Sequence, residues 1–512
     1  MKDGQEVVHR RWLFLLFLGV MLQLFAVFNS DLGLDAHVRL NAISDERLDG
    51  QELMWGPLRV SEDATQQPSD TALYDGYIPP WFTTEFAIKS TSILALFLVA
   101  MLAGVVPRWQ RVGGIFDPML ALLVLVSPVF LFATGRGYDE PMMALIVGIG
   151  VGGYFFNNGD QLHQQRLNVV LLATSLLLLM GWKGFGPVSS VTVWLLVCAL
   201  GGTWIELDRR LSPGQEQPPL RNPWLMAGIV ACVVYLSITL FGLVGGSGTF
   251  GVIAEAPLSF LFSSVMAILN AVVLFLFVGF ALWPAFGSAC RDLRQTRGPG
   301  ITLLMMFIAG LLTSLVAYIA ALWTLESSLW GLPLHETYLL LGNNGRYATC
   351  LLIPVILVLN WQRSESFIRR GVTKSWVLAL LLLLPAVLFT SLHGQQLWSE
   401  DAGERLDGFV IEGDKQVLLV APEALAMHHL YVLKTNVDPQ GERGIDGFWR
   451  TPDDALDLLM QQEWTPDLVV VAPGVDFAMS ENQWELLVEG KAPFTLTKGA
   501  DASAWRIYRF AG

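Results

Sequence analysis

The sequence predicts an α-helical polytopic membrane protein of about eleven transmembrane helices with a C-terminal extracytoplasmic α/β domain. The first observation is composition: 53% of the 512 residues are hydrophobic and 15% are charged, whereas soluble domains average about 25% charged residues. The second is a series of long apolar runs that stops near residue 392. The third is a tail with short continuous apolar runs bounded by turn residues, a pattern typical of buried strands.

A transmembrane helix needs about 20 apolar residues, and runs of that kind recur throughout the first part of the chain. No small-residue cleavage site follows the first run and more runs come later, so we interpret it as a retained anchor rather than a signal peptide. The region 168–204 also fits one span followed by a re-entrant piece. The runs lie at residues 12–29, 90–107, 115–133, 141–157, 168–183, 187–204, 223–244, 259–283, 301–324, 346–361 and 376–392.

Basic residues set the predicted orientation, because Lys and Arg accumulate on the cytoplasmic side of membrane proteins. Clusters of them precede the first run and follow the second, sixth, eighth and tenth runs. All of these clusters fall on one side when the spans are counted, so the N-terminus is predicted to be cytoplasmic in a multi-pass protein of the cell membrane. We expect a transmembrane domain at 1–392 with an outer loop at 30–89, and a soluble extracytoplasmic domain at 393–512.

The loop and the tail carry weaker patterns. Apolar residues at partly helical spacing in the middle of the loop, residues 40–58, predict a short helix lying along the membrane interface. In the tail, the apolar runs Val417–Val420 and Leu468–Val471 predict buried strands. Helical patterns follow at 422–430, 452–462 and 481–489, and the alternation from Trp505 to Phe510 predicts a closing strand. Together these elements predict a small α/β sandwich.

Charge and cysteine content exclude several classes of protein. The net charge of -13 argues against a nucleic-acid partner, because nucleic-acid binding requires a basic face. The predicted surroundings of the chain are the lipid bilayer. The cysteines lie in or beside apolar runs, so there is no disulfide framework and no Cys/His metal spacing. They are Cys198, Cys232, Cys290 and Cys350.

The predicted topology places many ionisable residues in loops on the outer face. Such a mixture suits a phosphate-bearing substrate, because a carboxylate can take a proton from an acceptor hydroxyl while Arg and Lys bind phosphate. Acidic side chains can also hold a divalent ion that neutralises developing phosphate charge. The residues are Asp31, Asp35, His37, Arg136, Asp139, Glu140, Lys183, Glu255, His335, Glu336 and Arg346.

The candidates that follow the first span have alternative interpretations. Asp31 fits a helix cap as well as a functional group. Asp35 is less obviously a cap, and we interpret it as functional because it is an ionisable group at a membrane exit. In an extended segment His37 lies on the same side as Asp35, and in a helix Arg39 does, so either side chain can orient that carboxylate.

The candidates in the later loops also have alternative, non-functional interpretations. Asp139 and Glu140 precede a Pro, so one of them can simply cap the next helix. Lys183 can extend from a span end to the interface, and Glu255 is most simply a solvated loop residue. Arg346, with Tyr347, is either an interfacial anchor or a cation kept for an anionic partner. His335 and Glu336 lack an HExxH partner, so no zinc site is predicted.

These motifs together resemble the GT-C glycosyltransferases, which are polytopic enzymes that use polyprenyl-phosphate-linked sugars. The segment Gly33–Arg39 resembles the first-loop motif of oligosaccharyltransferases and related enzymes, and Gly137–Glu140 resembles their second-loop acidic motif. Asn344–Tyr347 is similar to the Arg-Tyr of the protein and lipid A sugar transferases. The resemblance covers the layout of the membrane part, roughly 1–392.

The resemblance implies a role for each candidate. Asp35 is the expected catalytic carboxylate, assisted by His37 or Arg39, and Arg346 meets the lipid phosphate with Lys183 as a second cation. Tyr347, His335 and Glu336 complete the substrate-binding candidates. Asp139 and Glu140 position the acceptor or a divalent metal, Mg²⁺ or Mn²⁺, as the only cofactor implied.

The chain also departs from this family. The Trp-Trp-Asp-Tyr-Gly motif of oligosaccharyltransferases is absent, which argues against transfer of a whole glycan to Asn. The second motif is Asp-Glu-Pro rather than Asp-x-Asp, so acceptor positioning and metal binding remain alternatives for Asp139 and Glu140.

The functional expectation is an inverting membrane glycosyltransferase. It would transfer a sugar from a polyprenyl-phosphate donor to a lipid, glycan or protein acceptor on the outer face. One alternative is a transporter or flippase for a polar lipid or solute, which predicts ionisable residues near the bilayer midplane and paired broken helices. Another is a non-catalytic membrane scaffold whose tail binds a partner.

Overall fold

A computed structural model gives the fold. It describes residues 2–45, 55–57, 77–109, 116–156, 161–215, 218–246, 248–275, 298–360, 397–439, 441–461, 465–477, 483–491 and 504–511. The chain forms two compact units, a helical membrane unit and a sheet-containing unit. The membrane unit comprises Met1–Phe28, Ser92–Thr134 and Asp139–Ser391, and the sheet unit comprises Asn29–Thr91, Gly135–Tyr138 and Leu392–Gly512.

Seven helices in the described part of the chain are long and apolar enough to cross a membrane. Helices are expected there, because a bilayer offers no water to the backbone N–H and C=O groups. Four of the seven begin with Pro at the first or second position, which is favourable because the first turn needs no backbone donor. The seven are α1 (Lys2–Asn29), α3 (Glu85–Trp109), α7 (Leu162–Trp182), α8 (Pro187–Leu211), α9 (Pro223–Leu243), α11 (Pro257–Ala271) and α13 (Pro299–Leu329).

An eighth span is present if α4 (Pro118–Leu125) and α5 (Pro128–Gly135) count as one broken helix, bent by 59°. Pro128 explains the break, since Pro lacks the donor that would continue the helix. Gln23 of α1 is fully buried and donates from Nε2 to the Leu125 carbonyl at 2.6 Å. That hydrogen bond satisfies one carbonyl close to the break.

Shorter elements complete the membrane unit. The 3₁₀ helix η4 (Asn344–Leu351) continues into α15 (Leu352–Asn360). Runs of 3₁₀ helix beyond about four residues are uncommon, and η4 has eight. The remaining elements are α6 (Glu140–Phe156), η1 (Pro219–Arg221), η2 (Gly248–Gly251), α10 (Val252–Glu255) and α14 (Leu334–Leu340).

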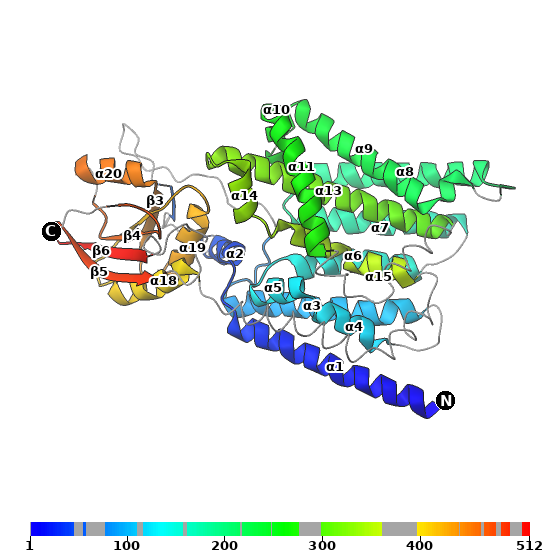
Figure 1. Ribbon diagram of the computed structural model, residues 1–512, viewed down its shortest axis with the longest axis horizontal. Helices are drawn as coiled ribbons and strands as arrows, with labels where there is room; N and C mark the ends of the chain where they lie inside the picture. The colour runs from blue at the N-terminus through cyan, green and yellow to red at the C-terminus, as the bar shows by residue number, and fades with distance from the viewer. Residues whose placement is uncertain are drawn as a thin grey trace. The chain divides into compact units, whose positions relative to one another are not determined.

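The helices of the membrane unit pack where small residues lie. Figure 1 shows α13 beside α9 and α11, and these pairs are in contact. At the α6–α7 contact, a Cβ on Gly150 would lie 2.6 Å from the Ser175 Cβ. At the α7–α8 contact, a Cβ on Gly201 would lie 2.5 Å from Val169. Small residues let helix backbones approach closely in membranes, so these glycines set the spacing.

The observed helices confirm some predicted spans and leave others outside the described residues. Helices α7 and α8 contain 21 and 25 residues, so 168–204 forms two long helices rather than one span and a re-entrant piece. The predicted span 346–361 starts in η4 and continues in α15. The predicted span 376–392 and the end of 259–283 lie outside the described residues, so the count of eleven stays a prediction.

The sheet unit is built on six strands in the order β1-β3-β2-β4-β6-β5. The first four are parallel, whereas β6 pairs antiparallel to β4 and β5. The central strands β2 and β4 are fully buried at Val417–Val420 and Leu468–Val471, as expected where a parallel sheet is covered on both faces. The strands are β1 (Trp55–Pro57), β2 (Gln416–Val420), β3 (Asp446–Arg450), β4 (Leu468–Val471), β5 (Trp484–Lys491) and β6 (Ala504–Phe510).

Three helices accompany the sheet in the C-terminal segment. Helices α18 (Trp398–Phe409) and α19 (Ala426–Val437) pack against each other beside the strands (Figure 1), and α20 (Pro452–Gln461) connects β3 to β4. The predicted strands at 417–420, 468–471 and 505–510 are confirmed as parts of β2, β4 and β6. The predicted helix at 481–489 is wrong for its described residues, because 484–489 belong to β5. Pairing with β6 decides its conformation, since strand formation depends on distant partners more than on local preference.

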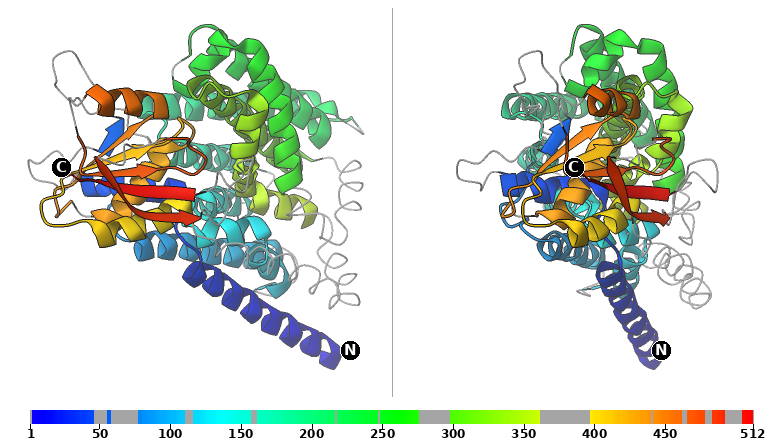
Figure 2. Two further views of the ribbon diagram at one scale, coloured as in Figure 1. Left: turned by 60° about the vertical axis from the view of Figure 1, so that its left-hand side comes forward. Right: turned by 90° about the vertical axis from the view of Figure 1, so that its left-hand side faces the viewer.

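The outer loop contributes directly to the sheet unit. Strand β1 pairs with β3, drawn beside it in Figure 2, and the Trp55 Nε1 donates to the Ile445 carbonyl at 2.9 Å. Helix α2 (Leu34–Asp45) lies against α19. The expected division had assigned loop 30–89 to the transmembrane domain and 393–512 to a separate domain, and the structure groups these segments together. Within the segment 40–58, where an interfacial helix is expected, residues 40–45 belong to α2 and 55–57 form β1, while 46–54 and 58 lie outside the described residues.

Candidate functional site

Glu140 and Arg346 form a buried ion pair in the membrane unit. Glu140 begins α6 and Arg346 lies on η4, with side chains 1% and 5% exposed. Arg346 Nε lies 2.7 Å from Glu140 Oε1, and its Nη1 donates to Asn343 Oδ1 at 2.6 Å. A buried charge is costly unless it is paired and hydrogen-bonded. The two sequence motifs that carry these residues, 206 positions apart, therefore meet in one cluster.

One oxygen of this cluster has no hydrogen-bond partner. Glu140 Oε2 is buried and accepts no hydrogen bond from any residue that the structure describes. Burying an unsatisfied acceptor costs about 1–3 kcal/mol, and more for a charged group. An added hydroxyl or ammonium donor would recover that free energy.

Asp139 and Lys183 form a second ion pair beside the first. Lys183 follows α7 directly, and its Nζ lies 3.1 Å from Asp139 Oδ2. The same Nζ lies 4.9 Å from the centre of the Tyr347 ring, and the Arg346 guanidinium lies 5.0 Å from it. Tyr347 thus contacts both cations through its aromatic face. Asp139, Glu140, Lys183 and Arg346 therefore lie close to one another around Tyr347.

Asn270 of α11 holds η4 in place, and the sequence analysis missed it. Its Nδ2 donates to the Gly342 carbonyl at 2.5 Å, and its Oδ1 accepts from the Gly345 N–H at 2.6 Å. A Cβ on Gly345 would lie 2.4 Å from Asn270 Oδ1, so only Gly fits there. A lone Asn near the end of an apolar helix was the available signal.

Asp35 lies in the first turn of α2 in the sheet unit. Its Oδ1 is 3.7 Å from the Nε2 of His428 on α19, and the two side chains are 41% and 24% exposed. Burial lowers the pKa of the His428 imidazole, and the Asp35 carboxylate opposes part of that shift. His428 is therefore neutral near pH 7, beside a carboxyl group that solvent reaches. The sequence analysis missed His428, which lies almost 400 residues from Asp35 and in a different predicted domain.

The turn that carries the second acidic motif supports the start of α2. Gly33 N–H donates to the Arg136 carbonyl at 2.9 Å, and Arg39 Nη2 donates to the Gly137 carbonyl at 2.6 Å. Gly137 has a φ of 69°, a conformation that favours glycine. A Cβ on Gly33 would lie 2.2 Å from the Tyr138 ring. Arg39 therefore anchors α2 to the turn, and it also contacts the Asp35 carbonyl through Nε at 3.4 Å.

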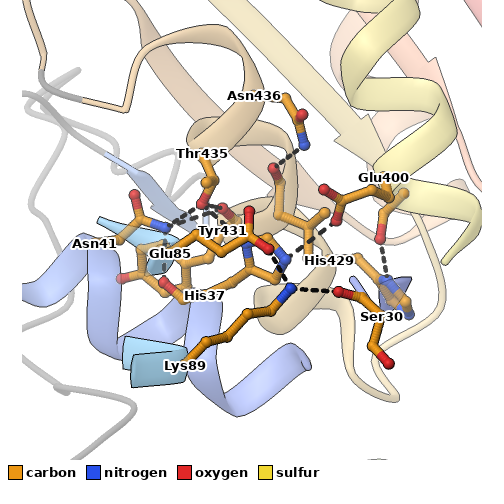
Figure 3. Close-up of polar contacts among 12 residues, drawn as sticks. Ser30, His37, Asn41, Glu85, Lys89, Glu400, His429, Tyr431, Thr435 and Asn436 are labelled. Carbon is orange, nitrogen blue, oxygen red and sulfur yellow. Dashed lines mark hydrogen bonds and ion pairs between the residues drawn. The ribbon is translucent and has the colours of Figure 1, made fainter. Parts of the chain in front are cut away.

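His37 faces the C-terminal helices (Figure 3). Its side chain is 1% exposed; Nε2 lies 3.1 Å from Glu400 Oε2 on α18, and Nδ1 lies 3.1 Å from Thr435 Oγ1 on α19. Asn41 Nδ2, one turn further along α2, donates to the same Thr435 Oγ1 at 2.9 Å and to the Tyr431 carbonyl at 3.0 Å. These contacts give His37 a role in docking α2, and the expected role of orienting Asp35 stays a prediction.

A second polar contact fixes the segment before α2 (Figure 3). Lys89 is buried and its Nζ contacts the Ser30 carbonyl and the Glu85 carboxylate. Burial raises the pKa of the nearby Asp31 carboxyl, Glu400 and Glu85 add to that increase, and Lys89 and Arg136 oppose it. Asp31 is therefore held among charges of both signs.

The remaining candidates lie elsewhere. His335 and Glu336 on α14 face each other at 3.9 Å with side chains 75% and 52% exposed, as solvated residues would. Asp139 and Glu140 each face a cation, and the described residues contain no group of three or more His, Cys, Asp or Glu that could hold a metal ion. This donor set does not fit a metal centre by itself, and the expected Mg²⁺ or Mn²⁺ stays a prediction.

Comparisons with known proteins add a fold-level similarity. No family model matches the sequence, and no curated protein matches it. Two crystal structures of ArnT from Cupriavidus metallidurans are similar. The one bound to undecaprenyl phosphate covers 98% of this chain and 98% of its own, with 11% identity and a TM-score of 0.43. The apo structure covers 92% and 94%, with 12% identity and a TM-score of 0.34.

Proposed function

We propose that the chain is a membrane glycosyltransferase that moves a sugar from a polyprenyl-phosphate-linked donor to a lipid, glycan or protein acceptor on the outer face. The observation that carries the proposal is the buried Arg346–Glu140 pair in an apolar helical unit. Ionisable residues buried beside apolar spans are costly and often functional. The sequence motifs that resemble GT-C enzymes contain both residues of this pair.

Arg346 and Lys183 are the proposed contacts for the donor phosphate. A guanidinium binds phosphate through two parallel N–H groups, and Lys adds a point charge. Charge develops on the phosphate as the bond to the sugar breaks, so fixed cations stabilise the transition state more than the ground state. The unpartnered Glu140 Oε2 can accept a hydrogen bond from a hydroxyl of the sugar or the acceptor.

Asp35 is the proposed general base. As the acceptor oxygen bonds to the anomeric carbon, its proton passes to the Asp35 carboxylate and the polyprenyl phosphate leaves with the bonding electrons. A base must be ionised and must reach the acceptor. Asp35 meets the second condition with a side chain that is 41% exposed. Attack on the face opposite the phosphate would invert the anomeric centre.

The test is transfer from a labelled lipid-linked sugar by purified protein in detergent or nanodiscs. The sugar is first identified by comparing lipid-linked sugars and glycoproteins in cells with and without the protein. Undecaprenyl phosphate, the molecule bound in one similar crystal structure, is the first lipid to try. Asp35→Asn is expected to lower kcat by about 10²–10⁴-fold, the usual contribution of general base catalysis.

Asp407→Asn is the matched control. Asp407 lies on α18 and pairs with Arg443, and its side chain is 43% exposed, so it has the charge and exposure of Asp35 without its position. The control is expected to keep wild-type activity. Full activity in Asp35→Asn would remove Asp35 as the base.

One observation favours a second candidate, a flippase or transporter. The α4–α5 break resembles the broken helices that bind substrate in transporters. Transporters usually carry such breaks in corresponding pairs, and the described part of the chain contains one. Movement of a labelled polyprenyl-phosphate sugar across sealed vesicles, without any product of transfer, would favour this candidate over the enzyme.

A further inference from the structure

Helix α2, which carries the proposed base, docks on the C-terminal segment through one polar seam. His37 and Asn41 lie four residues apart on α2, and Tyr431 and Thr435 lie four residues apart on α19, so each pair shares a helix face. Asn41 donates to both α19 residues, and His37 meets Thr435. The orientation of the Asp35 side chain therefore depends on residues near position 430.

His428 lies on the same face of α19 as these two residues. Positions 428, 431 and 435 follow the spacing of one helix face. The helix starts after Leu425, whose φ of 60° is the one positive value of a non-glycine residue in the described part of the chain. Left-handed backbone is unfavourable for a branched residue. This strained entry sets the position of the first turn of α19, which holds His428.

We propose that His428 is a positioning residue for Asp35. The neutral imidazole donates from Nε2 to Asp35 Oδ1, which turns Oδ2 toward the acceptor hydroxyl. The present separation of 3.7 Å exceeds a hydrogen bond, and contacts of this kind often shorten when substrate binds. The inference rests on the proposed function and adds that the C-terminal segment completes the catalytic machinery.

The charged surroundings of His428 define what its protonation does. Asp35 faces it from α2, and His429 is its neighbour on α19. His429 in turn interacts electrostatically with His37, which pairs with Glu400 of α18. A proton on His428 would place a cation beside Asp35. The cation stabilises the carboxylate and makes it a weaker base, so transfer slows as pH falls through the titration of His428.

The first experiment measures kinetics of the full chain in nanodiscs. His428→Ala is expected to lower kcat about 10- to 100-fold, the rate equivalent of one hydrogen bond to a charged group, with little change in KM. His428→Gln keeps an N–H donor and should recover part of kcat. Because Gln takes no proton, the acid limb of its pH profile should move to lower pH.

His429→Gln is the matched control, since His429 adjoins His428 but contacts Ser399 Oγ at 2.8 Å and the Trp398 ring. If His428 only supported packing, His428→Gln and His429→Gln would alter melting temperature and kcat together and leave the acid limb unchanged. That outcome, or wild-type kcat in His428→Ala, overturns the proposal.

A second experiment does not depend on activity. The chain has seven His residues, so ¹³C-labelled imidazoles can be followed by NMR and His428 assigned with His428→Gln. Asp35→Asn removes the carboxylate that favours the charged imidazole, so the pKa of His428 should fall. An unchanged His428 titration refutes the contact. If Asp35→Asn shifts the His428 titration but the wild-type protein transfers no sugar, the contact exists and the proposed function is refuted, and the positioning role with it.

Discussion

Two acid–base pairs of this molecule differ in how firmly they are held. Glu140 and Arg346 are almost fully buried and 2.7 Å apart, whereas Asp35 and His428 are partly exposed and 3.7 Å apart. The first pair is fixed by Asn343 and by the Asn270 contact to η4. The Asp35–His428 pair can change its separation without leaving a buried charge unpaired, because both side chains reach solvent. In the proposed reaction, the rigid pair would stabilise charge and the adjustable pair would take part in proton transfer.

The largest expected effect comes from breaking the rigid pair. Glu140→Ala leaves Arg346 buried without its carboxylate, which costs about 3–5 kcal/mol. Asp35→Ala breaks the exposed pair and should cost less than about 1 kcal/mol. Denaturant titration of both variants in detergent gives their free energies of unfolding, which can be compared with that of the wild type.

An exposed pair within the membrane unit serves as control. Arg166 and Glu206 are 2.6 Å apart with side chains 56% and 39% exposed, so the distance matches the Glu140 pair and the burial does not. Glu206→Ala should behave like Asp35→Ala. Equal destabilisation by Glu140→Ala and Glu206→Ala would end the distinction between the pairs.

A smaller effect is expected from moving the rigid pair without removing a charge. Gly345→Ala places a Cβ against Asn270 and should cost about 1–3 kcal/mol, as overpacked sites do, while lowering sugar transfer. Gly228→Ala on α9 meets no atom within 4 Å and should be neutral or slightly stabilising. Melting temperature and transfer rate are measured together. Wild-type values for Gly345→Ala would show that η4 adapts.

At neutral pH no effect is expected from the third difference, a pH dependence confined to the sheet unit. Burial, together with His428 and His37, lowers the pKa of His429 to about 3. The unfolded chain therefore binds a proton below about pH 6.5 that the folded chain does not. The contribution of His429 to the free energy of unfolding should be fully present above that value. It should fall toward pH 3, by at most about 1.4 kcal/mol per pH unit for one group.

Hydrogen exchange of α18 and α19 at neutral and at mildly acidic pH checks this expectation. Exchange should become faster at low pH, and His429→Gln should remove part of the change because Gln does not titrate. Exchange in η4 and α6, which carry the Arg346–Glu140 pair, should respond less, because His429 lies in the sheet unit. Faster exchange in both units alike would contradict a local origin.

The periodic and compositional parts of the fold could be predicted. Apolar runs located the seven long apolar helices of the described membrane unit, and Val417–Val420 and Leu468–Val471 located β2 and β4, because spans and fully buried strands both leave a continuous apolar signal. Residues 484–491 were misassigned because their strand is specified by pairing with β6. Trp55 gave no signal, since a three-residue edge strand is too short for a period.

The candidate site was predicted in part. Glu140, Arg346 and Lys183 were proposed because charged residues next to apolar runs stand out, and Tyr347 because it follows Arg346. Asn270 and His428 were missed because each looks ordinary within its own segment. His37 was found, but its contacts with Glu400 and Thr435 required knowledge of where α18 and α19 pack.

The sequence alone therefore determined that this is a helical membrane protein with a sheet-forming tail, and which charged residues border its spans. Those features follow from local hydrophobicity, which acts over a few residues. The tertiary structure alone decided that the first loop supplies α2 and β1 to the unit of the C-terminal segment, and that Asp35 faces His428. Such partners are chosen by packing and pairing between segments hundreds of residues apart, and no local pattern records that choice.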